Sequence, residues 1–514
     1  MRLPRFVPRK LRRGKTIRVV PACRLVLAGM AALVLASAGD AAPRGANALD
    51  TVQRMLVAGQ KGDCRTAAAL GAPLLDRKAA GIPSEMVPLL YELIVGCEVQ
   101  IDAVETGYRH ALAGTKLDDS GDRLWQMRLL IELSRPDKSA SLATLEAMTQ
   151  GRGAALNSFP AELIWELNRE VKEKGDKPLQ RRLLKVLASD AYYPDEPFGE
   201  PDEFRLSYAA MLADAGEQAA ARPVVERITA PNILARAMLD PRLRALVPAS
   251  ADVRAAAETS LARHRQEIGR YPDRLGPLIA AAADLRMLGR PAEAVDLLET
   301  ARARIGDKQA FTDRDKLLNW WWQGLASGHT RLGHYEPAMA AYRVGAAETE
   351  MGGPNVSQII NMAETQLDFG RPRDALKTLA AFDEPGRKGS PFGEMQVRWT
   401  RGCAFALGGQ RAKAEADLAY LKAHEKDAPG ALSHLLLCVG DLDGAAASYV
   451  RQLRDPEQRV QALLELSDYD DPPPGRPADA FEPGLKLLKK RPDVVAAAQA
   501  AGGTRRFNVQ SDEL

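Results

Sequence analysis

Apolar residues recur along most of the chain at the three-to-four-residue spacing of amphipathic α-helices, and short polar corners interrupt them. Each corner has a small or apolar residue, a glycine, two to four mostly polar residues, and an alanine that opens the next apolar run. Glycine suits the left-handed backbone that ends a helix, and a small alanine lets the second helix pack close to the first. The seven corners are Gly62–Ala67, Gly216–Ala221, Gly289–Ala294, Gly333–Ala338, Gly370–Ala375, Gly409–Ala414 and Gly440–Ala445.

The spacing of these corners indicates a repeat protein. From Ala294 to Ala445 the corner alanines lie 44, 37, 39 and 31 residues apart, which is typical of stacked helix pairs. A chain of 514 residues exceeds one compact core, and only 5% of its residues are aromatic, as suits packing through alanine and leucine. We therefore predict an all-α solenoid of antiparallel helix pairs, with degenerate repeats in the N-terminal half.

Breaks in the helical spacing divide the chain into segments. We predict a signal peptide at 1–38, a flexible leader at 39–48, degenerate helical repeats at 49–200, a helical repeat and irregular connector at 201–252, a repeat array at 253–467, a proline-rich linker at 468–484, and a C-terminal helix and tail at 485–514. The linker contains Pro472, Pro473 and Pro474, which stop a helix and stiffen the chain. The last amphipathic helix is expected at 485–501, followed by a loose tail.

The N-terminus resembles a secretory signal. Residues 1–24 hold nine cations and no acid, residues 25–38 are uncharged, and the stretch ends in Ala36-Ser37-Ala38. Fourteen residues span about 21 Å as a helix, less than the ~30 Å core of a bilayer. We therefore predict cleavage near Ala38 and a periplasmic or secreted bacterial protein with no stable membrane span. The alternative is an inner-membrane protein anchored by the uncleaved segment.

Signal removal changes the charge of the protein. The full chain has 70 basic and 67 acidic residues, but nine of the basic residues lie in 1–38, so 61 would remain against 67 acids. A mildly acidic mature chain has no basic footprint for nucleic acid, so we exclude nucleic-acid binding.

Four cysteines remain after residue 38, in two pairs separated by 33 and 35 residues: Cys64 with Cys97, and Cys403 with Cys438. One repeat length between partners would place each pair on neighbouring helix pairs. An even count in an exported chain favours two disulfides. The alternative is four buried free thiols.

One corner and its flanks resemble the tetratricopeptide repeat family. The pattern is Trp322-x2-Leu325-Ala326-x2-His329, then Leu332-Gly333-His334-Tyr335, then Ala338-x3-Tyr342. It departs from the family at Ala326, where glycine is preferred, and at His329, where a large aromatic residue is preferred. The resemblance implies a right-handed superhelix whose concave face, built from the first helix of each pair, binds peptides or partner proteins without catalysis.

The resemblance also implies which residues line that face. They are Trp320, Gln323, Ser327, Arg331, Ile360, Glu364, Asp368, Gln396 and Trp399. Trp320 and Trp399 would be the anchors, since aromatic side chains carry much interface energy. The competing interpretation is that the Trp320–Trp322 run belongs mostly to the core.

No catalytic or metal-binding motif accompanies the repeats. The six histidines are scattered singly, and no glycine-rich phosphate loop, HExxH or GxSxG sequence occurs. We therefore expect no cofactor, no metal and no enzymatic activity, and we interpret the chain as an exported scaffold that binds a peptide or protein. The alternatives are an envelope hydrolase or carbohydrate-acting enzyme with a site assembled across the solenoid, and self-association through the C-terminal helix.

Overall fold

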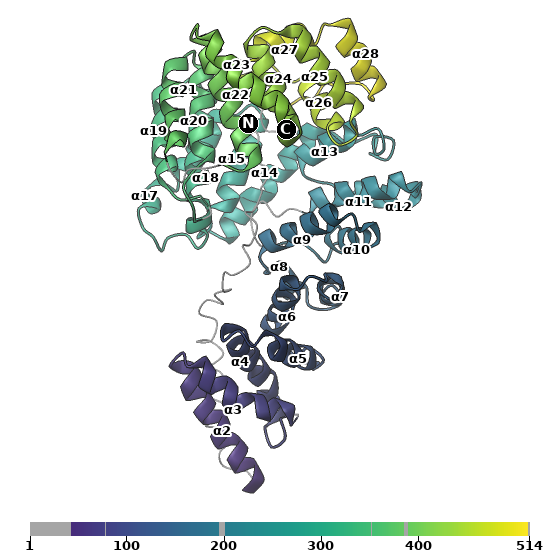
Figure 1. The fold of residues 1–514 in the computed structure, drawn as a ribbon, viewed down its shortest axis with the longest axis vertical. Coiled ribbons are helices and arrows are strands. Elements are labelled where there is room, and N and C mark those ends of the chain that lie inside the picture. Colours follow the sequence, from purple (N-terminus) through teal and green to yellow (C-terminus); the bar gives the residue numbers. More distant parts are fainter. Residues whose placement is uncertain (1–42, 78, 195–200, 351, 385–388, 512–514) are drawn as a thin grey trace. The chain divides into compact units, whose positions relative to one another are not determined.

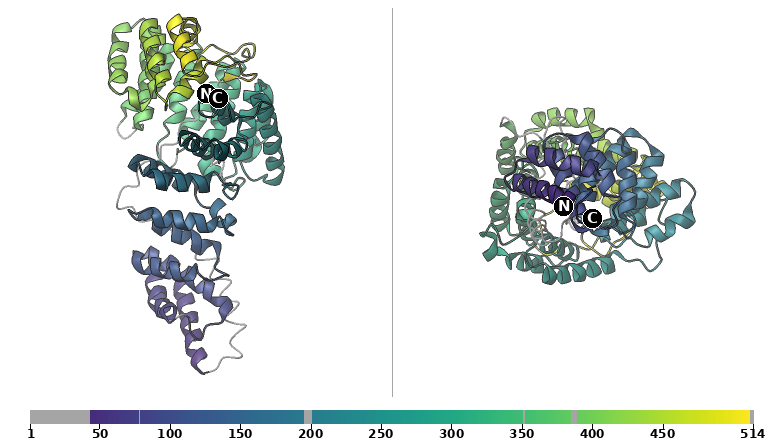
Figure 2. Two further views of the ribbon diagram at one scale, coloured as in Figure 1. Left: turned by 90° about the vertical axis from the view of Figure 1, so that its right-hand side faces the viewer. Right: turned by 90° about the horizontal axis from the view of Figure 1, so that it is seen from below.

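The computed structural model describes residues 43–77, 79–194, 201–350, 352–384 and 389–511. Within these ranges it contains 27 α-helices, three 3-10 helices and no β-strand, apart from two isolated bridges. The helices stack mostly as antiparallel pairs (Figures 1 and 2). The all-α prediction is confirmed, whereas the handedness of a superhelix stays a prediction. The predicted signal peptide at 1–38 lies outside the described residues.

The chain divides into two compact units between Phe204 and Arg205. The N-terminal unit contains α2 (Pro43–Gln60), α3 (Cys64–Asp76), η1 (Ser84–Met86), α4 (Val87–Gln100), α5 (Val104–Gly114), α6 (Asp122–Ser134), α7 (Ser139–Met148), α8 (Gly153–Asn157), α9 (Ala161–Lys174) and α10 (Lys177–Leu187). Helix α2 begins at Pro43, so the end of the predicted flexible leader is helical.

The C-terminal unit follows from α11, which starts at the boundary. Its elements are α11 (Asp202–Asp214), α12 (Gln218–Val225), α13 (Pro231–Leu239), α14 (Val253–Arg270), α15 (Gly276–Met287), α16 (Pro291–Glu299), α17 (Arg302–Ile305), α18 (Arg314–Arg331), α19 (Tyr335–Ala347), α20 (Ser357–Asp368), α21 (Pro372–Leu379), η2 (Ala380–Asp383), α22 (Pro391–Leu407), α23 (Arg411–Ala423), η3 (Glu425–Asp427), α24 (Pro429–Cys438), α25 (Leu442–Arg454), α26 (Arg459–Leu466), α27 (Glu482–Leu488) and α28 (Pro492–Ala500).

The seven predicted corners all join two helices, and their glycines share one backbone conformation. Each has a positive φ, between 69° and 78°, which a residue with a Cβ atom adopts at a cost. The alanine after each corner is at most 1% exposed, because the second helix packs there against the first. The corner interpretation is therefore confirmed at every position where it was made.

Two further corners, both in the N-terminal unit, were not predicted from the sequence. Helix α9 ends at Gly175, with φ 71°, and the turn between α4 and α5 places Asp102 at φ 64°. A non-glycine residue in that conformation is uncommon, so the α4–α5 corner carries no glycine signal. The core of this unit is built around fully buried residues such as Met55, Leu90 and Ile94.

The C-terminal region differs from the prediction. The expected single helix at 485–501 is two helices, α27 and α28, because Pro492 begins a new helix after a break at Arg491. The expected loose tail is ordered to residue 511: Phe507 and Val509 are 4% and 0% exposed. Both helices pack on α25, and α27 also packs on α24. Self-association through this region stays a prediction.

The ordered tail returns to helices α14 and α15 of the C-terminal unit. The backbone of 468–470 runs parallel to 505–509, joined by hydrogen bonds such as Asp470 N to Val509 O at 3.1 Å. Gln510 N then donates to Met287 O on α15 at 2.8 Å, and Arg254 on α14 donates to Asn508 O at 3.0 Å. Helix α26 also contacts α13. Within 205–511, the C-terminal residues therefore pack back on helices α14 and α15.

No helix among the described residues is both long enough and apolar enough to cross a bilayer.

Candidate functional site

The nine residues predicted to bind a partner lie on the first helices of three successive pairs. Trp320, Gln323, Ser327 and Arg331 are on α18, Ile360, Glu364 and Asp368 on α20, and Gln396 and Trp399 on α22. These helices contact one another in order, and α22 also contacts α24. We call the surface formed by α18, α20, α22 and α24 the first-helix face.

The burial of the nine residues sorts them into two groups. Gln323, Ser327, Arg331, Ile360 and Trp399 are buried, at 3% to 5% exposed. The remaining four, Trp320, Glu364, Asp368 and Gln396, are partly buried. In the tryptophan run, Trp321 and Trp322 are core residues at 0% and 8% exposed, so only Trp320 retains substantial access to solvent.

The side chain of Gln323 forms hydrogen bonds between helices. Its amide nitrogen lies 3.3 Å from the hydroxyl of Tyr342, and its amide oxygen accepts from Asn361 at 3.1 Å. The hydroxyl of Tyr342 also accepts from Thr365 at 3.2 Å, so the network connects α18, α19 and α20. Burial raises the pKa of Tyr342, which keeps its hydroxyl protonated at neutral pH. The polar atoms of Gln323 therefore stabilise the stack.

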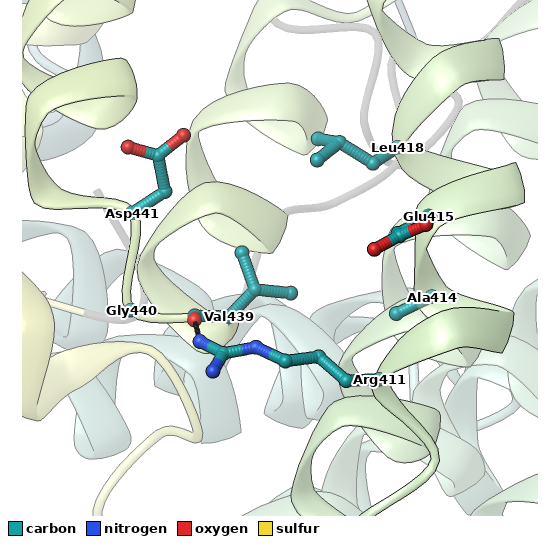
Figure 3. A pocket seen from close by; sticks show the side chains of 7 residues that line it. All are labelled: Arg411, Ala414, Glu415, Leu418, Val439, Gly440 and Asp441. Atoms are coloured by element: carbon teal, nitrogen blue, oxygen red, sulfur yellow. Dashed lines mark hydrogen bonds between the residues drawn. The ribbon is translucent and has the colours of Figure 1, made fainter.

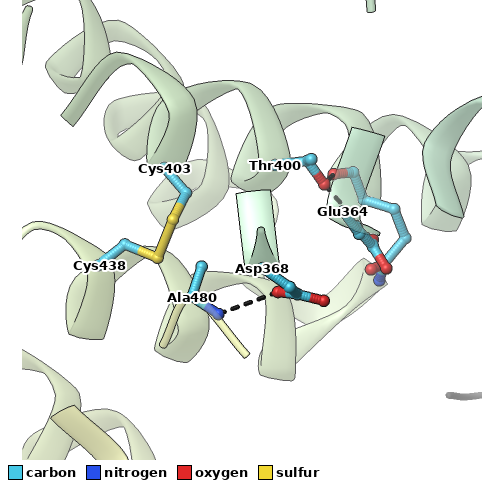
Figure 4. Close-up of a disulfide and its surroundings, with 7 residues drawn as sticks. Glu364, Asp368, Thr400, Cys403, Cys438 and Ala480 are labelled. Atoms are coloured by element: carbon cyan, nitrogen blue, oxygen red, sulfur yellow. Dashed lines mark hydrogen bonds between the residues drawn. A yellow bond between two sulfur atoms is a disulfide. The ribbon is translucent and has the colours of Figure 1, made fainter. Parts of the chain in front are cut away.

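A segment of the chain itself lies against the first-helix face. The backbone N–H of Ala480 donates to Oδ1 of Asp368 at 3.0 Å, although 112 residues separate them (Figure 4). The next residue, Phe481, stacks on His434 of α24 with ring centroids 4.0 Å apart and meets Trp399 edge-on at 6.1 Å. The predicted linker at 468–484 is thus docked on the array, and two of the predicted site residues contact it.

The same segment reaches the end of α18 as well. A Cβ atom built on Gly333 would lie less than 3 Å from the carbonyl oxygen of Gly475, a separation that Cβ atoms do not tolerate. The corner glycine at 333 therefore has a second role, since it admits another part of the backbone. From Gly475 to Phe481 the segment passes α18, α20, α22 and α24 in turn.

Acidic side chains gather where the segment crosses α20. Burial raises the pKa of Asp368 well above its usual range, and the negative charges of Asp479 and Glu364 raise it further. The positive charge of Arg476 opposes them. Arg476 itself pairs with Asp479 at 3.0 Å and with Glu482 at 3.4 Å. The contact between segment and helix thus involves four carboxyl groups, those of Glu364, Asp368, Asp479 and Glu482, and the guanidinium of Arg476.

A cysteine pair lies beside this contact. Cys403 on α22 and Cys438 on α24 have Cα atoms 5.4 Å apart and are within disulfide distance (Figure 4). Cys64 and Cys97, on α3 and α4, are also within disulfide distance, with Cα atoms 4.7 Å apart. Both pairs are those expected from the sequence, and each connects neighbouring helix pairs.

A surface pocket of about 320 Å³ lies elsewhere, between α23 and the corner at Gly440 (Figure 3). Its lining is Arg411, Ala414, Glu415, Leu418, Val439, Gly440 and Asp441. The guanidinium of Arg411 donates a hydrogen bond to the carbonyl of Val439, so this side chain stabilises the fold. The pocket contains none of the predicted site residues.

Three histidines pair with carboxylates. The shortest distances are 2.9 Å for His110–Glu98, 2.7 Å for His264–Asp284 and 3.5 Å for His434–Glu465. Each pair joins two helices and is largely buried, and none lines the pocket in Figure 3. Burial lowers the pKa of His110, but hydrogen bonding and charge from Glu98 outweigh it, so that its pKa is raised.

These pairs therefore support the packing of helices. Across the described ranges, no group of three or more histidine, cysteine, aspartate or glutamate side chains is arranged to hold a metal ion. The enzymatic alternative would be favoured by a histidine–carboxylate pair, or by two or more carboxylates converging in one pocket. The pocket in Figure 3 is lined by two carboxylates, Glu415 and Asp441, and by no histidine. Asp441 caps α25, where it accepts a hydrogen bond from the N–H of Gly444 at 2.8 Å.

No protein-family model and no curated protein matches the chain. Among solved structures, a chain of the Cut9–Hcn1 hetero-tetramer of the APC/C is 12% identical, with a TM-score of 0.30 over 93% of this chain and 99% of that one. A chain of the Naa15/Naa10 complex bound to HypK-THB is 13% identical, with a TM-score of 0.25 over 93% and 78%. With TM-scores this low, neither match bears on what this chain does. By its own helix pairs and glycine corners, the chain is an all-α stack of antiparallel helix pairs.

Proposed function

We propose that this chain is an exported, non-catalytic scaffold that binds a protein partner in extended conformation along the first-helix face. One observation carries the proposal: the face already holds a polypeptide segment without helix or strand, through a backbone N–H on Asp368 and an aromatic ring on Trp399 and His434. Backbone capture combined with an aromatic anchor is a common way for proteins to bind peptides.

Export is part of the proposal. It is supported by the signal-like N-terminal sequence and by two cysteine pairs within disulfide distance, which are compatible with an oxidising compartment. The test is intact-mass spectrometry of the chain purified from its native source. We expect a mass that begins after Ala38 and is four hydrogens short of the reduced form; a full-length, fully reduced chain would contradict export.

Partner binding is tested by crosslinking and affinity capture from the native envelope. We expect specific partners to be recovered with the wild type and their yield to fall at least about tenfold with Trp320→Ala combined with Trp399→Ala, since truncated aromatic hot spots cost at least 1–2 kcal/mol. Trp125→Ala is the matched control, because it removes a partly buried tryptophan from the N-terminal unit. Circular dichroism must show all variants folded. Equal recovery of partners with the double variant and the control would show that the partner does not bind the first-helix face.

A further inference from the structure

The segment on the first-helix face has the character of a peptide ligand. It consists of residues 472–481, Pro-Pro-Pro-Gly-Arg-Pro-Ala-Asp-Ala-Phe, and we call it the strap. It contains no helix or strand, and its four prolines carry no N–H group. One tight turn, closed by the hydrogen bond from Arg476 N to Pro473 O at 3.2 Å, interrupts it. Because its prolines already restrict the backbone, the segment loses little entropy when it is bound.

Much of the strap is accessible to solvent. Pro472, Pro474, Gly475 and Ala478 are exposed, and the other strap residues are partly buried. Its contacts with the array include the Gly475 carbonyl at the Gly333 corner, the Ala480 N–H on Asp368, and the Phe481 ring beside Trp399 and His434. A segment that belonged to the core would be buried along its length, whereas a surface ligand alternates anchors with exposed residues.

We propose that the strap is an intramolecular occupant of the first-helix face, and that the partner of this face supplies a segment of the same chemistry that displaces it. That chemistry is a proline-rich stretch without helix or strand, ending in a backbone N–H followed by an aromatic side chain. The inference rests on the proposed function and adds the class of partner and the regulation of its binding.

Tethering makes the strap a strong competitor. A segment held in the same chain has an effective concentration of about 1 mM at its site. A free copy of the strap would therefore bind the wild type with an apparent Kd of about 1 mM, however tight its intrinsic binding. For an intrinsic Kd of about 10 µM, removing the competitor tightens binding about 100-fold.

The test uses the full chain with residues 472–481 replaced by ten glycine and serine residues, which keeps the connection between α26 and α27. The probe is a labelled synthetic peptide of residues 470–483, followed by fluorescence anisotropy. We expect the peptide to bind this variant at least tenfold more tightly than the wild type. The peptide carrying Phe481→Ala is expected to bind neither. A peptide that binds neither protein, or both equally, overturns the proposal.

A second variant covers the case in which the replacement disturbs folding. Phe481→Ala in the full chain removes only the aromatic anchor of the strap, and we expect it to bind the wild-type peptide at least threefold more tightly than the unaltered chain does. The control is Leu487→Ala on α27. Leu487 is 57% exposed, so its truncation removes little packing. Equal affinity of Phe481→Ala, Leu487→Ala and the wild type overturns the proposal.

Failure of the inference and failure of the proposed function give different results. If the strap variant binds the peptide but neither form captures an envelope partner, the strap is a displaceable occupant and the scaffold proposal fails. If the wild type captures a partner as well as the strap variant does, and the peptide binds neither, the scaffold proposal stands and the strap is a fixed part of the fold.

Discussion

Gly333 and Gly409 offer a matched pair of substitutions that isolates the contact between strap and array. Both are corner glycines with φ of 75°, so alanine is strained to the same extent at either site. They differ in their surroundings. A Cβ atom at 333 meets the backbone of Gly475, whereas a Cβ atom at 409 meets nothing within 4 Å.

The expected magnitudes follow from these two facts. Alanine in the left-handed conformation costs about 1–2 kcal/mol, so Gly409→Ala should lower the free energy of unfolding of the C-terminal unit by that amount. Gly333→Ala carries the same cost and adds an overlap with backbone, and inserting atoms into a packed contact typically costs about 1–3 kcal/mol. We therefore expect Gly333→Ala to be more destabilising than Gly409→Ala by about 1–3 kcal/mol.

Urea unfolding followed by tryptophan fluorescence measures the difference. Four of the six tryptophans lie in the C-terminal unit, so the signal reports mainly on that unit. The strap variant with residues 472–481 replaced provides the internal control, because the excess cost of Gly333→Ala should disappear in it. If the two alanine variants differ by less than about 0.5 kcal/mol in the wild-type background, Gly475 does not pack on the corner as described.

The other predictions concern titratable groups and cysteines. Cys403→Ala with Cys438→Ala should lower the free energy of unfolding of the C-terminal unit by about 3–4 kcal/mol, from the chain entropy of a loop of this length. Reductant should lower the stability of this unit in the wild type but not in the variant, and a wild type with four free thiols by mass spectrometry would contradict this. The pKa of Asp368 is raised in the folded state, so folding disfavours the ionised carboxylate. The stability of the protein is therefore unaffected by this group below about pH 4, and it falls as the pH rises above that value. Asp368→Asn, which keeps an acceptor for Ala480, should therefore become more stable than the wild type with rising pH, by up to about 1.4 kcal/mol per pH unit; a pH-independent difference would show that this carboxyl is not shielded from water. The pKa of His110 is raised as well, so its stabilising contribution is full below about pH 6.5 and is lost as the pH rises through the folded-state pKa. Urea titrations of the wild type and His110→Gln should show their largest difference near pH 6 and a smaller one near pH 9, and the opposite trend would rule out the pairing with Glu98.

The corners were predictable because they are local. A glycine that must take a positive φ and an alanine that must fit between two helices leave a signature within six residues, and all seven were found. The corner at Asp102 was not, because its conformation is imposed by the packing of α4 on α5 and not by residue type. The break before α28 did leave a local signal, Pro492, which the helical spacing of 485–501 obscured.

The candidate site was only partly predictable, for a different reason. The nine residues do lie on the first helices of three successive pairs, as the resemblance implied, and their binding of a partner stays a prediction. The resemblance did not show that Gln323 is hydrogen-bonded to Tyr342, or that the ring of Phe481 packs against Trp399. Such contacts join residues tens of positions apart, and no periodicity in the sequence encodes them. The strap is the clearest case. Its proline cluster predicts a stiff linker, and the same cluster would be expected whether the linker packs on the array or not.

The hydrogen bonds between the C-terminal tail and helices α14 and α15 have a consequence for how the unit unfolds. Open rows of repeats melt first at their termini, where each end pair has a neighbour on one side only. Here the bonds made by Gln510 and Arg254 tie the residues after α28 to helices early in the row, so this end cannot fray without breaking contacts on α14 and α15. Hydrogen exchange in α28 should accordingly slow to rates near those of the central helices, and clipping the last few residues should speed it up.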